Sequence, residues 1–372
     1  MIYLQYISIV LTIFYVLLIF IYWCGWITIK KYVPNSTVAF RSFSILIPVR
    51  NEAAVIEKCL EDICKQHFPS QHFEVIIIDD HSTDETIKVI NQFISANTNI
   101  NIKLLSMFDD AEQRKLKKAA ITYGVSHAQN DFIILTDADC ERGVEWLTTI
   151  NHFLIETGIN MCYAPVAFSA TNVFEKIQSM EFAGLVGIGA AAINIKNPNM
   201  CSAANLIFEK NVFYEVEGYK GYDGIASGDD EFLMHKVFKR YPNSVRFLKN
   251  KKAIVYTSAN TSIKQLADQR RRWVSKSTKY ENRYITAILV GAYLFNLAII
   301  VNLFTDYHFG LNMLYAKISI ETIFLFSVLH FFDRKKYLLF LPFAEIFHIM
   351  YVLIIGIWAN YGTYSWKGRD VK

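Results

Sequence analysis

The sequence predicts an α/β protein in which a mostly parallel sheet, flanked by helices, lies between apolar segments at the two ends of the chain. Three observations support this prediction. Apolar residues make up 53% of the 372 residues and are concentrated at both ends, which indicates membrane segments rather than a larger core. Between the ends, short apolar runs alternate with helical patterns, as in parallel sheets. Acidic residues follow these runs, at the edge where open α/β sheets bind their ligands.

The apolar run from Ile2 to Ile29 is long enough for a transmembrane helix, which needs ~20 residues. It has neither the preceding basic residues nor the small-residue cleavage site of a signal peptide, so we expect a retained anchor over 1–30. Lys30 and Lys31 follow the run, and the positive-inside rule places the next domain in the cytoplasm.

Two strand–helix pairs come next in the chain. The first strand, Ser44–Pro48, leads to a helix that ends near Gln66, and the second, Phe73–Ile78, leads to a helix over 85–95. No Gly-x-Gly-x-x-Gly follows the first strand, and Gly-x-x-x-x-Gly-Lys occurs nowhere. These absences argue against a dinucleotide oxidoreductase and a P-loop NTPase. The net charge of +4 is too small to indicate a nucleic-acid partner. The basic residues cluster beside the apolar segments, where anionic lipid headgroups would lie.

The stretch 131–139 contains a short buried strand followed by Asp137 and Asp139. Side chains two residues apart on an extended segment point the same way, so these carboxylates converge. Hard oxygen ligands at one point suit Mg²⁺ or Mn²⁺. The alternative is a solvated turn, in which Asp is common. A helix that opens with Lys117 and ends near Gly124 precedes this strand, and its basic residues face either a diphosphate or solvent.

Three later segments have two interpretations each. The helix over 171–195 contains the apolar run 182–189, which is too short and Gly-rich for a membrane span, so this helix is interfacial or core-facing. The acids at 229–231 open a helix, where they either compensate its dipole or supply a catalytic base. The cluster 268–273 contains three arginines beside Trp273, which suits diphosphate binding and sugar stacking or, alternatively, a basic patch at lipid headgroups.

Three further apolar segments occupy 284–304, 311–332 and 337–358. If the first two cross the membrane as a hairpin, the basic loop 334–336 lies inside, as the positive-inside rule requires. The third contains a proline, a glutamate and a histidine, and its crossing would put the basic tail 361–372 outside. We therefore expect a re-entrant or interfacial third segment. The six cysteines show no metal-ligand spacing and are expected to be reduced thiols.

Four separated pieces of the chain resemble the signature of the membrane-bound family 2 glycosyltransferases, which reads D, D-x-D, D, Q-x-x-R-W. The family includes ceramide-glucosyltransferase-like and polysaccharide-synthase-like members. The pieces are Asp79-Asp80, Asp137-Ala138-Asp139, Asp229-Asp230 and Gln269-Arg270-Arg271-Arg272-Trp273. The resemblance covers roughly 44–273 and implies a GT-A fold, which is Rossmann-like. The expected domains are an anchor over 1–30, a cytosolic GT-A domain over 42–280, membrane segments over 284–360 and the tail over 361–372.

The same resemblance implies roles for residues at matching positions. Asp230 is the expected general base, and Asp139 with Asp137 the expected ligands of the divalent cation. The expected nucleotide-sugar-binding residues are Pro48, Glu52, Asp79, Asp80, Lys117 and Asp137. The expected acceptor and diphosphate residues are Asp229, Gln269, Arg272 and Trp273. Departures from the family pattern occur at Ser202, Ala203, Leu116 and Thr122, and these bear on which sugar and acceptor are used.

The resemblance implies an inverting, metal-dependent transfer of a sugar from a nucleotide-sugar, with a UDP-sugar favoured, to a membrane-associated acceptor. A lipid acceptor is favoured because a polymer channel would need more spans. The alternatives are a component of a polysaccharide synthase and, more remotely, a non-catalytic nucleotide-sugar-binding membrane protein. The expected location is the cell (inner) membrane, with several spans and a cytoplasmic catalytic domain.

Overall fold

The computed structural model describes residues 2–34, 39–109, 116–222, 225, 227–276, 282–358, 364–366 and 369–371. The chain forms two compact units. The helical unit comprises Met1–Thr28, Ala170–Ala191 and Ala259–Lys372, and the sheet unit comprises Ile29–Ser169 and Ala192–Ser258. The predicted functional domain boundaries remain predictions, and half of the predicted basic tail 361–372 lies outside the described residues.

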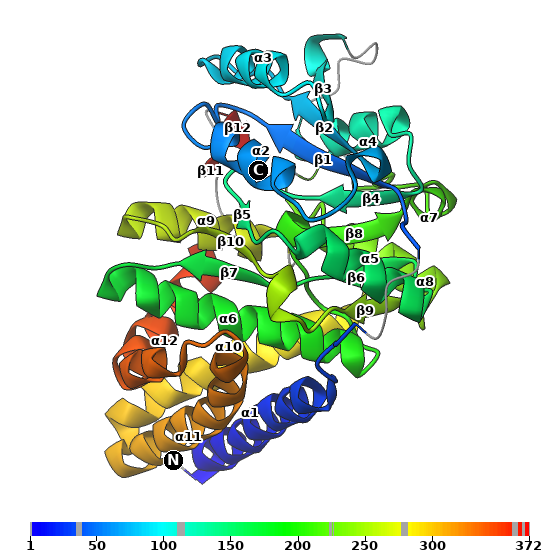
Figure 1. Ribbon diagram of the computed structural model, residues 1–372. Coiled ribbons are helices and arrows are strands. Elements are labelled where there is room, and N and C mark those ends of the chain that lie inside the picture. The colour runs from blue at the N-terminus through cyan, green and yellow to red at the C-terminus, as the bar shows by residue number, and fades with distance from the viewer. Residues whose placement is uncertain are drawn as a thin grey trace. The chain divides into compact units, whose positions relative to one another are not determined.

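A seven-stranded sheet in the order β3-β2-β1-β4-β8-β6-β9 forms the centre of the sheet unit (Figure 1). Strand β8 alone among these runs antiparallel to its neighbours, so the sheet is mostly parallel, as predicted. The strands are β1 (Phe43–Val49), β2 (Phe73–Asp79), β3 (Asn101–Ser106), β4 (Phe132–Leu135), β6 (Met161–Tyr163), β8 (Leu206–Glu209) and β9 (Val245–Phe247).

The helices of the sheet unit include those predicted after the first two strands. They are α2 (Ile56–Cys64), α3 (Thr86–Ala96), α4 (Lys117–His127), α5 (Trp146–Thr157), α7 (Lys210–Glu215) and α8 (Glu231–Arg240). Helix α4 lies directly on the sheet at Gly124, where an added Cβ would come within 2.9 Å of the Ile78 side chain and 3.2 Å of Leu46. The close approach leaves no room for a larger side chain. The N-terminal lysines of α4 are thereby fixed beside the strand ends.

A second sheet, which the sequence patterns do not predict, consists of three short strands in the order β5-β10-β7. They are β5 (Glu141–Arg142), β7 (Val166–Ser169) and β10 (Val255–Ser258). Strand β10 pairs antiparallel with β5, with Tyr256 opposite Glu141. This register carries Thr257 to the turn that follows β4, and so gives the site a residue from far along the chain.

The helical unit contains four helices that are long and apolar enough to cross a membrane, counted over the described residues. Three of them, α1 (Ile2–Thr28), α10 (Arg283–Thr305) and α11 (Tyr307–Phe331), pack against one another (Figure 1). The fourth is α12 (Leu341–Trp358), preceded by a short 3₁₀ turn. Its length and apolarity suit a full span as well as the predicted re-entrant segment, and its topology remains a prediction. The hairpin β11 (Tyr364–Trp366) and β12 (Arg369–Val371) follows.

Polar and aromatic contacts hold the membrane-type helices of this unit together. Asn302 of α10 is buried and donates a 2.8 Å hydrogen bond to the Ser8 hydroxyl of α1. Lys317 of α11 is fully buried and lies 2.5 Å from carboxylate oxygens of both Glu321 and Glu345. Buried charges are retained where they are paired, and this network joins α11 to α12.

Helix α6 (Val173–Asn194) is the Gly-rich helix for which an interfacial and a core-facing position were both predicted. Two of its glycines, Gly184 and Gly187, face α11 within the helical unit. An added Cβ on Gly184 would come within 3.0 Å of Leu325, and one on Gly187 within 2.6 Å of Val328. The core-facing alternative is therefore correct for this face of the helix. Helix α9 (Ile263–Ser275), which carries the arginine cluster, also belongs to this unit and packs against α12.

Candidate active site

The carboxyl ends of β1, β2 and β4 meet at one edge of the main sheet because these three strands run parallel. Val49 is paired with Asp79 across β1 and β2, and the Thr136 amide after β4 donates to the Leu46 carbonyl at 3.2 Å. The predicted loops after the three strands therefore lie side by side. This edge is where ligands of open α/β sheets bind.

The loop after β1 is bonded to the loop after β2. The guanidinium of Arg50 donates to the carbonyl oxygens of Asp80 and His81 at 2.7 and 2.8 Å. The Asn51 carboxamide oxygen accepts from the Thr83 amide at 2.8 Å. Asn51 and His81 both adopt positive φ, a strained backbone conformation that persists where surrounding contacts enforce it. The two loops therefore form one rigid rim.

Of the predicted nucleotide residues, Glu52 and Asp80 lie on this rim, whereas Pro48 lies within β1 and Asp79 ends β2. Asp79 is fully buried, and its carboxylate accepts from the Ser82 amide at 3.2 Å. Asp80 lies 3.0 Å from Nδ1 of His81. The Glu52 amide donates to the Thr86 hydroxyl at 2.8 Å. The Asp79 carboxylate thus stabilises the turn 79–82 by accepting from its backbone, while Glu52 and Asp80 belong to the joined loops.

Lys117 links two of the predicted acidic pieces. Its ammonium lies 2.7 Å from Oδ1 of Asp137 and 3.2 Å from Oδ2 of Asp229. Burial by itself lowers the pKa of Lys117, but the two carboxylates raise that pKa above its ordinary value. Burial raises the pKa of Asp229, but the attraction of the Lys117 ammonium lowers it by more. The pKa of Asp229 therefore lies below its ordinary value. Lys117 and Asp229 are therefore ionised at neutral pH, and Lys117 ties the segment after β4 to the segment before α8.

Lys118, which the sequence analysis did not single out, holds the segment that precedes Asp229. Its buried ammonium donates to the carbonyl oxygens of Tyr222, Ile225 and Ser227 at 3.1, 2.7 and 2.8 Å. The same ammonium lies 5.0 Å from the centre of the Phe232 ring. Its neighbour Lys117 was selected by its match to a family motif, and Lys118 had no such signal. A buried lysine with three carbonyl acceptors is recognisable only in the folded chain.

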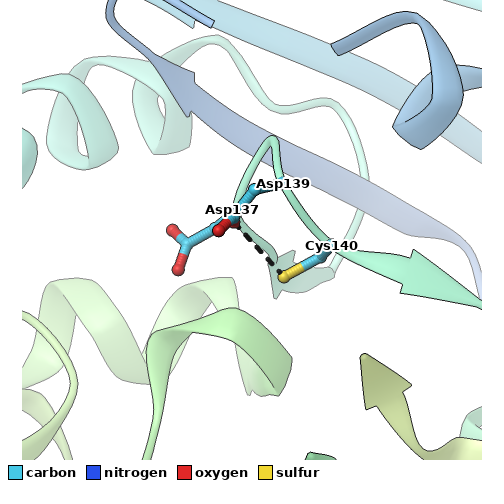
Figure 2. Close-up of side chains that lie close together, drawn as sticks. All are labelled: Asp137, Asp139 and Cys140. Atoms are coloured by element: carbon cyan, nitrogen blue, oxygen red, sulfur yellow. Dashed lines mark hydrogen bonds between the residues drawn. The ribbon is translucent and has the colours of Figure 1, made fainter. Parts of the chain in front are cut away.

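The turn after β4 groups Asp137, Asp139 and Cys140, with one ligand atom of each within 4.8 Å of the others (Figure 2). The Thr257 hydroxyl of β10 donates to Oδ2 of Asp139 at 2.8 Å. The Cys140 thiol lies 3.8 Å from the other oxygen of Asp139, and burial raises the pKa of this thiol well above its ordinary value. Cys140 is therefore a neutral thiol, and Asp137 and Asp139 supply the carboxylate oxygens of the group.

The donor set suits a hard divalent cation. Two carboxylates from one turn supply the oxygen ligands that Mg²⁺ and Mn²⁺ prefer, and such ions complete their shell with water and substrate phosphates. A neutral thiol is a poor ligand for these ions. Thr257 fixes the orientation of Asp139 as outer-shell groups do in metal sites. The residues present fit the predicted cation.

Asp230, the predicted base, is the N-cap of α8. Its Oδ1 accepts from the Glu231 amide at 2.8 Å, and its Oδ2 accepts from the Ala203 amide at 3.3 Å. Ala203 belongs to the segment 201–206, which resembles the acceptor-side motif of the family. Asn205 of that segment is fully buried and donates to the carbonyls of Pro165 and Ala253 at 2.9 and 2.8 Å. Asp230 and this segment therefore adjoin each other within the sheet unit.

The remaining predicted residues, Gln269, Arg272 and Trp273, lie on α9 in the helical unit. The Gln269 side-chain oxygen accepts from Nδ2 of the Asn260 side chain at 2.9 Å, and Trp273 packs beside Phe182 with ring centres 5.9 Å apart. Both contacts are part of the packing of α9 on neighbouring segments of its own unit.

Comparison with known proteins agrees with this arrangement. The model of the family described as glycosyl transferase family 2 matches residues 44–222. The glycosyltransferase AglE of Haloferax volcanii is 26% identical over 202 residues, which cover 53% of this chain and 60% of AglE. A dolichyl N-acetyl-alpha-D-glucosaminyl phosphate 3-beta-D-2,3-diacetamido-2,3-dideoxy-beta-D-glucuronosyltransferase of Methanococcus voltae is 34% identical over 95 residues, 26% of this chain and 28% of that protein. The matches thus span less than two thirds of these relatives.

Among solved structures, a mannosyltransferase of Pyrobaculum calidifontis, determined with GDP-Man and Mn²⁺, shares the fold. It superposes with a TM-score of 0.65 at 14% identity, over 96% of this chain and all of that chain. The order of strands, the acidic turn after β4 and the matched residues 44–222 lead to one conclusion. Residues 44–222 form a glycosyl transferase family 2 domain, and the protein has a GT-A fold.

Proposed function

We propose that this protein is an inverting, divalent-metal-dependent glycosyltransferase that moves a sugar from a nucleotide-sugar, most readily a UDP-sugar, to a membrane lipid. One observation carries the proposal. Lys117 pairs with Asp137 of the candidate metal turn and with Asp229, the neighbour of the candidate base Asp230. The groups that would hold the donor and the group that would activate the acceptor are thereby tied into one charged cluster.

The donor would bind at the edge formed by the ends of β1, β2 and β4. Glu52 and Asp80 would contact the nucleoside, the buried Asp79 would hold the turn that carries Asp80, and Asp137 with Asp139 would hold the cation at the diphosphate. The cation, when bound, would neutralise the charge that develops on the leaving diphosphate. Lys117 would orient Asp137 through their 2.7 Å ion pair. The GDP-sugar bound by the mannosyltransferase neighbour makes GDP-sugars the second donor class to test.

Asp230 would remove the proton from the acceptor hydroxyl as the new glycosidic bond forms and the bond to the diphosphate breaks. Its two oxygens accept from backbone amides of Glu231 and Ala203, which fixes the carboxylate beside the segment that resembles the acceptor motif. General-base assistance of this kind contributes typically ~10²–10⁴-fold. A single displacement at the anomeric carbon inverts its configuration and needs no nucleophilic carboxylate. Gln269, Arg272 and Trp273 of α9 are proposed to complete the acceptor and diphosphate side.

A lipid acceptor is supported by two observations. The helical unit has four helices of spanning length, and the relative from Methanococcus voltae is named for a dolichyl-linked acceptor. We place the protein in the cell (inner) membrane with its sheet unit in the cytoplasm, since Lys30 and Lys31 follow the first apolar helix. A component of a polysaccharide synthase is the alternative, and a long product would favour it.

The test is a donor screen with the full chain in detergent, native lipid extract, Mn²⁺ or Mg²⁺, and a panel of UDP- and GDP-sugars. We expect one donor class to give a glycosylated lipid of a single added sugar by mass spectrometry, and the activity to disappear with a chelator. Asp230→Asn should lower turnover by ~10²-fold or more. Asp131→Asn is the control, because it makes the same change just before β4, at the end of that strand away from the acidic turn. Full turnover of Asp230→Asn would refute the assignment of the base, and a ladder of long products would refute the lipid acceptor.

A further inference from the structure

Arg270, the first of three consecutive arginines on α9, is joined to α6 by an ion pair. Its Nη2 lies 2.8 Å from a carboxylate oxygen of Glu181, and the two side chains are only 5% and 19% exposed. Its Nη1 donates to the Gln269 side chain at 2.8 Å, and its guanidinium lies 4.4 Å from the centre of the Trp273 ring. One arginine thus touches both Gln269 and Trp273, two residues of the proposed acceptor side.

Glu181 is the centre of a contact among three helices. Besides Arg270 of α9, it accepts a hydrogen bond from the Tyr351 hydroxyl of α12, the last apolar helix. Burial raises the pKa of Glu181, but Arg270 outweighs this effect, and the net pKa lies below its ordinary value. The carboxylate is therefore charged at neutral pH. A buried charge with two donors from different helices tolerates few alternative arrangements.

The same two residues of α9 are held by α6 independently of the ion pair. Asn260, which donates to Gln269, also donates to the Gln178 side chain at 3.2 Å. Trp273 packs beside Phe182, the residue that follows Glu181. On the other side, the Arg271 guanidinium lies 4.6 Å from the ring of Trp358, at the end of α12. Helix α9 is thus fixed between α6 and α12.

We propose that Glu181 and Arg270 are positioning residues that set the orientation of Gln269 and Trp273, and that α12 contributes to this orientation through Tyr351. The proposal rests on the proposed function, in which α9 completes the acceptor side. Arg270 and Arg272 then have different roles: Arg270 orients neighbouring side chains of the protein, and Arg272 belongs to the proposed acceptor and diphosphate side. Since misplacing a catalytic constellation by about 1 Å can cost ~10²-fold in rate, loss of this pair should be measurable without any change at the donor carboxylates.

Three substitutions test the positioning role. Glu181→Gln removes the charge while keeping the shape, and Tyr351→Phe removes one donor. Arg270→Lys keeps a cation for Glu181 but loses the flat guanidinium and the second donor to Gln269. We expect kcat for transfer to fall ~10–100-fold in Glu181→Gln and Arg270→Lys, and by less in Tyr351→Phe, whose ring remains. Lys264→Gln, at an exposed position of the same helix, is the control and should leave kcat unchanged.

A double-mutant cycle separates positioning from a general loss of stability. If Glu181 acts through Trp273, the kcat of Glu181→Gln/Trp273→Ala should be no more than ~3-fold below that of the poorer single variant. Multiplied effects would overturn the proposal, as would full activity of both Glu181→Gln and Arg270→Lys.

Hydrogen exchange of the α9 peptide 263–275 supplies a readout that needs no catalysis. We expect exchange there to be faster in Glu181→Gln and Arg270→Lys than in the wild type, while exchange of the β1 and β4 amides stays unchanged. Equal protection of α9 in all forms would overturn the proposal. If the wild-type chain shows no transfer from any donor, the proposed function fails, and this exchange experiment still decides whether the pair orients α9.

Discussion

Replacing Lys117 by methionine removes the cation between Asp137 and Asp229 and keeps a side chain of similar length. The Lys117 side chain is 18% exposed, and those of Asp137 and Asp229 are 36% and 11% exposed. Breaking a fully buried pair by removing one partner costs about 3–5 kcal/mol. Because Asp137 is partly screened by water, we expect a loss of about 2–4 kcal/mol, which for a unit of roughly 200 residues lowers the Tm by about 5–15 °C.

The loss should depend on pH in a defined direction. The pKa of Asp229 is lowered in the folded protein, so its contribution is present above the unfolded pKa of about 3.9 and is lost as pH falls through the folded pKa. The pKa of Lys117 is raised, so its contribution is present below the unfolded pKa of about 10.4 and is lost as pH rises through the folded pKa. The difference in Tm between wild type and Lys117→Met should therefore be constant from about pH 5 to 9 and shrink below about pH 4.

The matched control is Lys252→Met. Lys252 lies 2.6 Å from Glu145, a separation like that of Lys117 from Asp137, but these side chains are 56% and 45% exposed. Exposed pairs contribute about 0–1 kcal/mol, so the Tm of this variant should change by no more than about 4 °C. Thermal unfolding of the detergent-solubilised chain, followed by tryptophan fluorescence, measures both variants. Equal losses for the two variants, or a loss for Lys117→Met that persists unchanged at pH 3.5, would refute the reasoning.

Three further predictions follow from the site and the packing. Asp139→Asn removes one of two carboxylate ligands and should weaken Mn²⁺ binding, measured by calorimetry, at least ~10-fold. Thr257→Ala removes only the hydrogen bond to that carboxylate and should weaken binding less. Equal Mn²⁺ affinity of wild type and Asp139→Asn would contradict the metal assignment. Cys140→Ala should leave Mn²⁺ affinity within about 3-fold of wild type, because a neutral thiol is a poor ligand for a hard ion, and a larger loss would make the thiol a ligand. Gly310→Ala should destabilise the helical unit by about 1–3 kcal/mol, because the added Cβ would lie 2.6 Å from the Leu303 backbone nitrogen. The control Gly143→Ala, with no neighbouring atom within 4 Å of the added Cβ, should have little effect on Tm. Equal Tm values for the two variants would show that the α10–α11 turn relaxes freely.

Much of the architecture was predictable because it depends on local patterns of apolar and polar residues in the sequence. The expected strands at 44–48, 73–78 and 132–135 are β1, β2 and β4, and the apolar segments after 284 are helices α10, α11 and α12. Each depends on the periodicity of a short window and on the rule that parallel strands place their carboxyl ends at one edge. The grouping of Asp137 with Asp139 follows from the alternation of side chains on an extended segment, because residues two positions apart share a side.

The sequence alone therefore determined the fold class, the acidic edge of the sheet and the apolar helices. The tertiary structure decided which basic and hydroxyl groups meet those acids. Thr257 contacts Asp139 across 118 positions, and Arg270 contacts Glu181 across 89, and neither pair lies within any periodic window. Such contacts depend on the register of short strands, as between β10 and β5, and on the close packing of helices at glycines, as between α6 and α11. Register and packing are properties of the whole fold, because each side chain there is placed by neighbours that the chain brings from a distance.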